Sequence, residues 1–170
     1  MAIGISEKDI QTLSDKLVGR LRAKSLTVST AESCTGGGVG YAITSVPGSS
    51  DVYLGGVVSY SNDVKSGVLS VSPDILSGVG AVSGECAESM AKGVLNLVGS
   101  DVAVSITGIA GPGGATDGKR VGLVYFGLAT SSGKCYTKRY VFDGDRAAVR
   151  RSSVGKALEL LLEAVGEIEV

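Results

Sequence analysis

The sequence predicts a three-layer α/β/α sandwich built on a mixed sheet that is mostly parallel, with one antiparallel strand. Short apolar segments rich in valine alternate along the chain with longer segments whose apolar residues recur at helical spacing. Near the end, two strand-like segments follow each other directly, joined by the turn SSG (131–133). The alternation favours a parallel sheet covered by helices on both faces, and the hairpin supplies the antiparallel strand. We expect a single domain over residues 1–170.

The first half of the chain predicts two helices and two strands. Ser6 is a suitable N-cap for a helix whose apolar face carries Ile10, Leu13, Leu17 and Leu21. LTVST (26–30) reads as a strand, and after the turn ESCT the segment GGGVGYAITS opens a short helix. Its glycines lower helix propensity, which indicates close approach to other segments. PGSS (47–50) is a turn, and YLGGVVSYS (53–61) is predicted to be a buried strand.

The second half continues the alternation. Asn62 is expected to cap a short helix that carries Lys65, and Ser72-Pro73-Asp74 starts another. Ser83 begins a helix that Gly99 ends, with an inner face of Ala87, Met90, Ala91, Val94, Leu95 and Val98. A strand (101–107), a glycine-rich loop (108–119) and the two hairpin strands (121–130 and 134–142) come next. The final helix starts near 143–145 and presents Val154, Leu158, Leu161, Leu162 and Val165.

Composition excludes several classes of function. The net charge of −1, with no tryptophan and few aromatic residues, provides neither a basic field nor stacking platforms, so we expect no nucleic-acid partner. The start MAIGISEKDI lacks the pattern of a signal peptide, and no apolar run is long enough to span a bilayer, so we expect no membrane partner. Three widely spaced cysteines argue against a disulfide framework, which favours a cytoplasmic location.

The chain contains no histidine, which removes the commonest ligand of catalytic zinc and every Ser-His or Cys-His pair. We therefore expect no metal and no cofactor. Two phosphate-binding motifs also fail. The segment 113–119 fits G-x-x-x-x-G-K, but Arg120 follows where Ser or Thr is needed, and a strand comes next instead of a helix. Around 36–40 the glycines miss the spacing G-x-G-x-x-G, because Tyr41 takes the last position.

Polar segments follow three predicted strands: TAESCTGG (30–37), SYSNDVK (59–65) and TGIAGPGG (107–114). In open α/β sheets, ligands bind outside the carboxyl ends of parallel strands, so these segments are expected to meet at one crevice. An isolated serine before a helix is usually an N-cap, but Ser33 is also placed to be a nucleophile beside backbone N–H groups. Its base must then be a carboxylate, a tyrosinate or a neutral lysine. Lys65, five residues after Tyr60, is the best-placed candidate.

At these residues the sequence resembles the C-terminal domain family of the competence- and damage-inducible CinA proteins. The matching stretches cover most of residues 28–150, and AESCTGG followed by TGIAGPGG is the most specific part; the others are VPGSSDVYLGGVVSYSNDVK (46–65), GAVSGECAESMAKG (80–93), VGLVYFGLA (121–129) and FDGDR (142–146). The resemblance implies a three-layer fold, a homodimer, and metal-free deamidation of nicotinamide mononucleotide to nicotinate mononucleotide and ammonia.

The resemblance also implies roles for particular residues. Ser33 would be the nucleophile and Lys65 its base, Tyr60 and Thr107 match further active-site positions, and Arg146 would hold the substrate phosphate. Main-chain groups of the two glycine segments would complete the substrate-binding set, which comprises Glu32, Cys34, Thr35, Gly36, Gly37, Gly108, Gly111, Gly113 and Arg146. Glu32 has two alternative roles, orienting Lys65 or capping a turn.

Other interpretations stay open at this point. Cys34 is an alternative attacking atom, and Lys119 either faces the phosphate or is solvated. The loop reads ATDGKR (115–120), where the family tends to have a Gly-Thr-Pro type segment with proline after the lysine. The domain fused N-terminally in longer relatives is expected to be missing together with its activity. The rival functions are a non-catalytic nucleotide-binding module, the same Ser-Lys amidase acting on another carboxamide, and a purely structural interaction domain.

Overall fold

The computed structural model describes residues 4–170, so the first three residues of the N-terminal segment considered above lie outside it. Five strands form one sheet in the order β2-β1-β3-β4-β5. Strand β1 pairs in parallel with β2 and β3, whereas β4 runs antiparallel to both β3 and β5. The mixed sheet with one antiparallel strand is thus confirmed; the strands are β1 (Val28–Glu32), β2 (Tyr53–Val58), β3 (Val102–Gly108), β4 (Leu123–Thr130) and β5 (Cys135–Val141).

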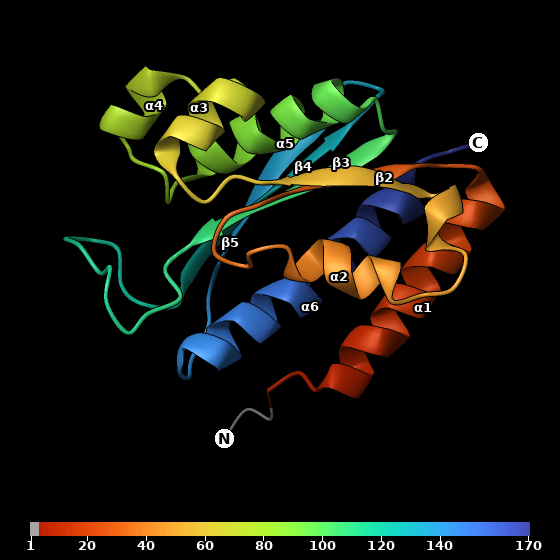
Figure 1. Cartoon of the computed structure of the whole chain (residues 1–170), viewed down its shortest axis with the longest axis horizontal. Coiled ribbons are helices and arrows are strands. Elements are labelled where there is room, and N and C mark those ends of the chain that lie inside the picture. Colours follow the sequence, from red (N-terminus) through yellow and green to blue (C-terminus); the bar gives the residue numbers. More distant parts are fainter. Residues whose placement is uncertain (1–3) are drawn as a thin grey trace.

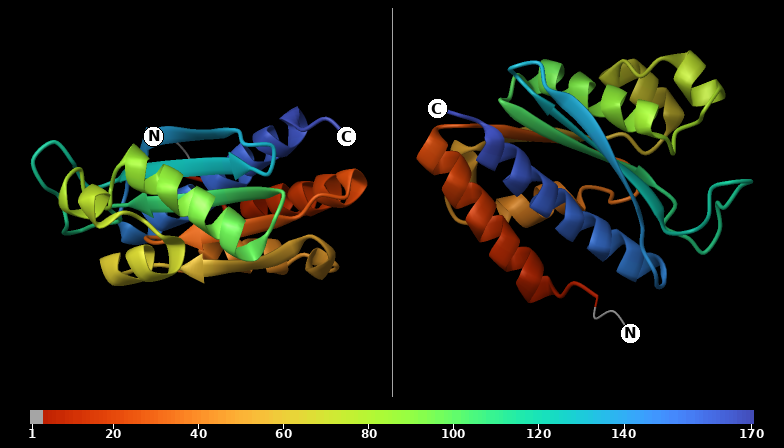
Figure 2. Two further views of the ribbon diagram at one scale, coloured as in Figure 1. Left: turned by 90° about the horizontal axis from the view of Figure 1, so that it is seen from above. Right: turned by 180° about the vertical axis from the view of Figure 1, so that it is seen from behind.

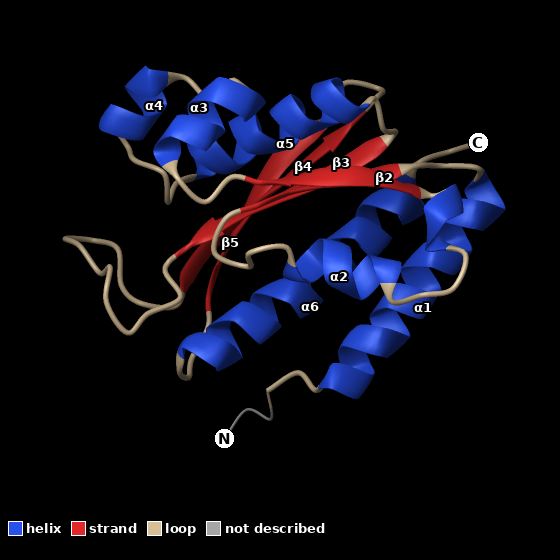
Figure 3. Cartoon of the chain, in the orientation of Figure 1, coloured by secondary structure: helices blue, strands red, loops and turns tan. Residues whose placement is uncertain are grey.

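Helices cover both faces of this sheet (Figures 1 and 3). One face carries α1 (Glu7–Lys24), α2 (Gly38–Thr44) and α6 (Arg146–Glu167). The other carries α3 (Asn62–Leu69), α4 (Pro73–Ser77) and α5 (Gly84–Val98), and a short 3-10 turn, η1 (Ser49–Asp51), precedes β2. Seen from behind, α6 lies along the sheet with α1 beside it, and the loop between β3 and β4 projects from the body (Figure 2).

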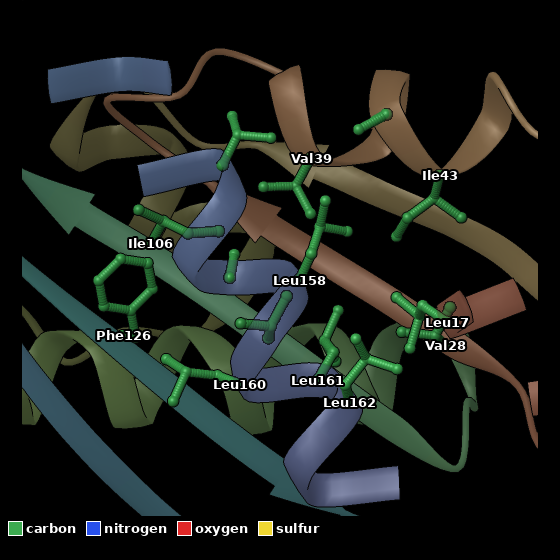
Figure 4. Packing of buried hydrophobic residues seen from close by; sticks show 14 of the residues in the cluster. Leu17, Val28, Val39, Ile43, Ile106, Phe126, Leu158, Leu160, Leu161 and Leu162 are labelled. Carbon is green, nitrogen blue, oxygen red and sulfur yellow. The ribbon is translucent and has the colours of Figure 1, made fainter. Parts of the chain in front are cut away.

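The larger apolar core fills the space between the sheet and the layer of α1, α2 and α6 (Figure 4). Leucines of α6 lie at its centre and contact side chains that β1, β3 and β4 direct to the same face. A smaller cluster, which includes Cys86, Met90 and Val94 of α5, packs on the opposite face. Both faces of β1 and β3 are therefore buried, which is why these segments read as nearly continuous apolar runs.

Most predicted helix boundaries are confirmed. Ser6 caps α1 and forms a reciprocal capping box with Asp9. Ser83 caps α5, and Gly99 ends it in the left-handed conformation. Pro73 stands in the first turn of α4 and Asp145 caps α6, as their positions in the sequence predicted.

Three local predictions were wrong. The N-cap of α3 is Ser61, whose extended backbone lets its hydroxyl accept from the Val64 N–H, while Asn62 is already helical. The first strand runs two residues later than 26–30, because its ladders with β2 and β3 continue to Glu32. The segment 53–61 is not a buried strand: β2 ends at Val58, and it alternates between half-buried and exposed positions because it lies at the edge of the sheet.

A close contact between α3 and α5 fixes the position of the helix that carries Lys65. Gly93 of α5 lies against the last turn of α3, and a Cβ atom added there would stand 2.1 Å from the carbonyl oxygen of Leu69. No side chain fits at that distance, so the two helices pack at a separation that only glycine permits. Gly19 in α1, by contrast, has no atom within 4 Å of the equivalent point.

This contrast predicts opposite effects for the same substitution. Gly19→Ala should raise the free energy of unfolding by about 1 kcal/mol, because alanine favours the helix and meets no neighbour. Gly93→Ala should lower it by about 1–3 kcal/mol, because α3 must be displaced. Urea denaturation of both variants measures the difference, and a stabilising Gly93→Ala would contradict the close packing.

Candidate active site

The strand order β2-β1-β3 brings three strand ends together, and the chain segments that follow them line one cavity of about 450 Å³. This is the position at which ligands bind in open α/β sheets, where successive connections leave to opposite faces. Two lining residues follow β1, one comes from the connection after β2 and two from α3, and the largest group comes from β3 and the loop after it. The lining residues are Ser33, Cys34, Tyr60, Asn62, Lys65, Ala81, Val82, Thr107, Gly108, Ile109, Ala110, Gly111, Gly113, Gly114 and Arg146.

Ser33 is held directly at the end of β1. Its N–H donates to the carbonyl of Ile106 on β3 at 2.9 Å, while Ser59 N–H, after β2, donates to the carbonyl of Glu32 at 2.8 Å. The chain is thus bonded to both neighbouring strands up to the residue where it turns away. Ser33 lines the cavity and is only 8% exposed, so its hydroxyl is held in a largely buried position.

Lys65 reaches Ser33 from α3. Its Nζ lies 3.0 Å from Ser33 Oγ and also donates to the carbonyls of Ser59 at 2.7 Å and Tyr60 at 3.2 Å. The side chain is 1% exposed, and no carboxylate of residues 4–170 forms an ion pair with it. Burial therefore lowers the pKa of Lys65, since the ammonium loses hydration without gaining a counter-charge. The lysine is a candidate base in contact with a candidate nucleophile.

Cys34 lies beside Ser33, but its thiol is poorly suited to attack. Burial raises the pKa of Cys34 to about 11, with the nearby Glu32 carboxylate acting in the same direction. The thiol is therefore protonated near neutral pH, and it is the thiolate that reacts. The geometry and the charge state both favour Ser33.

Glu32 faces away from the cavity. Its carboxylate accepts from the N–H groups of Val39 and Gly40 at 2.9 and 3.0 Å and from Thr35 Oγ1 at 2.7 Å. The N–H groups in the first turn of a helix have no carbonyl acceptor within the helix, so the carboxylate caps α2 by accepting from them. Of the two roles left open by the sequence, the structure shows the capping one.

Thr35, Gly36 and Gly37, which the sequence assigned to substrate binding, also lie outside the cavity lining. Gly36 and Gly37 have φ values of +59° and +99°, which allow the tight turn between Ser33 and α2. These two glycines contribute to the shape of this turn. Gly108, Gly111 and Gly113, in contrast, line the cavity as expected.

The far side of the cavity is basic. Arg146, in the first turn of α6, donates to the carbonyl of Gly111 at 2.8 Å and to the hydroxyl of Tyr60 at 3.2 Å. Thr107 is buried, and its hydroxyl donates to the carbonyl of Ala81 at 2.8 Å. Arg146 brings a positive charge to the cavity and none of its lining residues is acidic, so the cavity suits an anionic ligand.

Sequence reasoning missed part of the lining. Ala81 and Val82 precede the N-cap of α5, and their only signal was the resemblance of the segment around them. It also missed Arg150, which donates to the carbonyls of Cys34 and Thr35. Its signal was its place four residues after Arg146, on the same helix face. Lys119 does not line the cavity; its ammonium donates to the carbonyl of Val79.

A larger cavity of about 520 Å³ lies at the opposite end of the sheet, where β3 begins and β4 ends. Among the residues that line it, Lys134 pairs with Glu167 and Asp101 bonds to Thr27, and no serine contacts a free lysine. Within residues 4–170, no three His, Cys, Asp or Glu side chains cluster closely enough to hold a metal ion. No helix in this part of the chain has the length and hydropathy of a membrane span.

The fold and the site define an α/β domain with a buried serine–lysine pair at the end of strand β1. The model of the CinA C-terminal domain matches residues 10–165, and the chain belongs to this family. It is 43% identical to the nicotinamide-nucleotide amidohydrolase PncC of Escherichia coli K12, over 92% of this chain and 95% of that protein. It is 50% identical to a CinA-like protein of Rippkaea orientalis, over 90% of this chain but 37% of that longer protein.

Solved structures agree with this membership. The competence damage-inducible protein A of Klebsiella pneumoniae superposes with a TM-score of 0.91 at 35% identity, over 94% of this chain and 99% of that one. The competence/damage inducible protein of Agrobacterium tumefaciens gives 0.90 at 38% identity, over 98% and 100%. The chain spans about 37% of the length of several CinA-like relatives, of which it matches one domain.

The capping role of Glu32 predicts a loss of stability on Glu32→Gln. The carboxylate now accepts from the N–H groups of Val39 and Gly40 and from the Thr35 hydroxyl. A glutamine would place its own N–H group against one of these donors, and the buried donor left unpaired would cost about 1–3 kcal/mol. The control is Glu7→Gln, because Glu7 is an exposed residue in the first turn of α1. Urea denaturation of both variants measures the change in the free energy of unfolding. Equal stability of Glu32→Gln and the wild type would show that the carboxylate does not hold α2.

Proposed function

We propose that this chain hydrolyses the carboxamide of nicotinamide mononucleotide, giving nicotinate mononucleotide and ammonia. The observation that carries the proposal is the 3.0 Å contact between Ser33 Oγ and the buried Lys65 Nζ, at the wall of a cavity that also presents Arg146. The substrate is taken from the name of the E. coli relative, a nicotinamide-nucleotide amidohydrolase of nearly the same length.

In the first step, neutral Lys65 accepts the proton of Ser33 as its oxygen attacks the carboxamide carbon. The carbonyls of Ser59 and Tyr60 occupy two N–H groups of the amine, which leaves its lone pair directed at the serine hydroxyl. Burial lowers the pKa of the lysine, which increases the share of this neutral form at a given pH. No histidine is needed, because the base reaches the nucleophile directly.

The negative charge that develops on the carbonyl oxygen needs N–H donors. The Gly36 N–H already donates to the Ser33 carbonyl at 3.1 Å, whereas the N–H groups of Cys34 and Thr35, the two residues directly after Ser33, donate to no main-chain carbonyl of residues 4–170 and are the candidates next to the nucleophile. The hydroxyl of Thr107 donates to Ala81, so it supports the wall of the cavity and would have to rotate to act as a donor.

Collapse of the tetrahedral intermediate transfers the Lys65 proton to the leaving nitrogen and releases ammonia. A nicotinoyl ester of Ser33 remains. Water then attacks this ester while Lys65 accepts the proton of the water, and the same proton returns to Ser33 Oγ as the acid departs. Lys65 is the proton donor in this proposal because it has just taken the proton of Ser33, while the hydroxyl of Tyr60 accepts from Arg146.

The phosphate would bind opposite the serine. Arg146 supplies charged donors, and the glycine-rich loop 108–114 supplies main-chain N–H groups around the same space. Tyr60 and Gly111 hold the guanidinium in place. A phosphate-free carboxamide would lose these contacts, so binding should depend strongly on the nucleotide.

We also propose that the protein acts as a homodimer in the cytoplasm. In support of a dimer, the edge strand β2 exposes Leu54 and Val58, at 48% and 51%, beside its unpaired main-chain groups. In support of a reducing compartment, Cys34, Cys86 and Cys135 are all free thiols.

Ammonia release from nicotinamide mononucleotide tests the proposal, with nicotinamide as the phosphate-free comparison. We expect turnover by the wild type and a loss of about 10⁴-fold or more in Ser33→Ala and Lys65→Met, since the pair acts as a unit. Ser132→Ala, in the hairpin turn, and Lys16→Met, on the surface of α1, are matched controls expected to retain full rate. A wild type that binds the nucleotide without turnover would favour a binding module. Equal turnover of nicotinamide would point to another carboxamide.

A further inference from the structure

Arg150 contacts the turn that follows Ser33 (residues 34–37), and it lines a different cavity from the one that contains Ser33. Its Nε donates to the carbonyl of Cys34 at 3.1 Å, and its Nη2 donates to that of Thr35 at 3.4 Å. Its neighbour Arg151, in contrast, pairs with a glutamate. Among residues 4–170, no carboxylate forms an ion pair with Arg150. Its charge is therefore directed at the main chain that follows Ser33.

This main chain separates two cavities. Ser33 and Cys34 line the substrate cavity, whereas Thr35 and Arg150 line a second cavity of about 360 Å³ between α1, α2 and α6. The peptide group that joins Cys34 to Thr35 lies between them. In a planar trans peptide the N–H points opposite to the carbonyl. Because Arg150, which lines the second cavity, binds the Cys34 carbonyl, the Thr35 N–H is directed away from Arg150.

The Thr35 N–H is also available. The N–H groups of Gly36 and Gly38 donate to the carbonyls of Ser33 and Thr35, but within residues 4–170 the Thr35 N–H donates to no main-chain carbonyl. We propose that Arg150 is a positioning residue that aims the Thr35 N–H at the oxyanion formed on attack by Ser33. The proposal rests on the hydrolytic function proposed above, and it gives a role to a residue that takes part in none of the chemical steps described there.

Two physical effects follow from this contact. The guanidinium restrains the rotation of the peptide group, so the donor is preorganised before charge develops. A charged donor on the carbonyl also polarises the peptide, which strengthens the N–H on its other end. Since Arg146 lies one turn earlier on α6, this helix sets both the phosphate contact and the oxyanion donor.

The test compares Arg150→Met with Arg151→Met, a neighbouring exposed arginine that pairs with Glu7 instead of the loop. For nicotinamide mononucleotide we expect kcat of Arg150→Met to fall by about 10- to 100-fold with KM near the wild-type value, because the donor acts in the transition state. Arg150→Lys should recover part of the loss. Millimolar guanidinium should raise kcat of Arg150→Met by occupying the second cavity, and should not raise that of Arg151→Met.

Three results would overturn the inference. They are a kcat of Arg150→Met within twofold of the wild type, an equal fall of kcat in both variants, and a fall that guanidinium does not reverse. The rate at which a fluorophosphonate labels Ser33 gives a second readout, because its phosphoryl oxygen needs the same donor. If the wild type labels at Ser33 but does not release ammonia, the proposed substrate is wrong, and slower labelling of Arg150→Met still supports the inference. If the wild type does neither, both proposals fail.

Discussion

The burial of Lys65 without a carboxylate partner is the constraint on which the rest of the site depends. An ammonium in that position loses hydration and gains only three oxygen acceptors, two of them main-chain carbonyls. The fold tolerates this because α3 is fixed against α5 at a glycine contact and because the ends of β1 and β2 supply the acceptors. A lysine paired with a carboxylate would keep its proton and could not serve as a base for Ser33.

Topology then determines what surrounds this pair. Strand β1 lies between β2 and β3 and is parallel to both, so three chain segments reach the same end of the sheet. The antiparallel β4 returns from that end and lets the loop between β3 and β4 form one wall of the cavity. Helix α6 closes the opposite side with its first turn. Each wall therefore comes from a different element, and the rigid sheet holds their spacing.

Much of this arrangement could be predicted from the sequence. Alternating strand and helix patterns, the hairpin turn and the capping residues gave the fold class and most helix starts. The polar segments after three strands indicated the cavity. The buried strand predicted over 53–61 failed because the sequence does not show that β2 lies at the edge of the sheet, where it is half exposed. For Glu32 the sequence left two roles open, and only the unpaired N–H groups at the start of α2 decide between them. Arg150 acts through main-chain carbonyls, and only its place four residues after Arg146 on the same helix face pointed to it.

The most direct test of this account is an NMR titration of Lys65, with ¹³C-labelled lysine and Lys65→Met used to assign the Cε signal. The account predicts a pKa clearly below the ordinary value of about 10.4, so that the neutral amine, and with it kcat/KM, increases as the pH rises through that pKa. A pKa at or above the ordinary value would mean that Lys65 stays protonated at neutral pH, which would contradict its role as the base for Ser33.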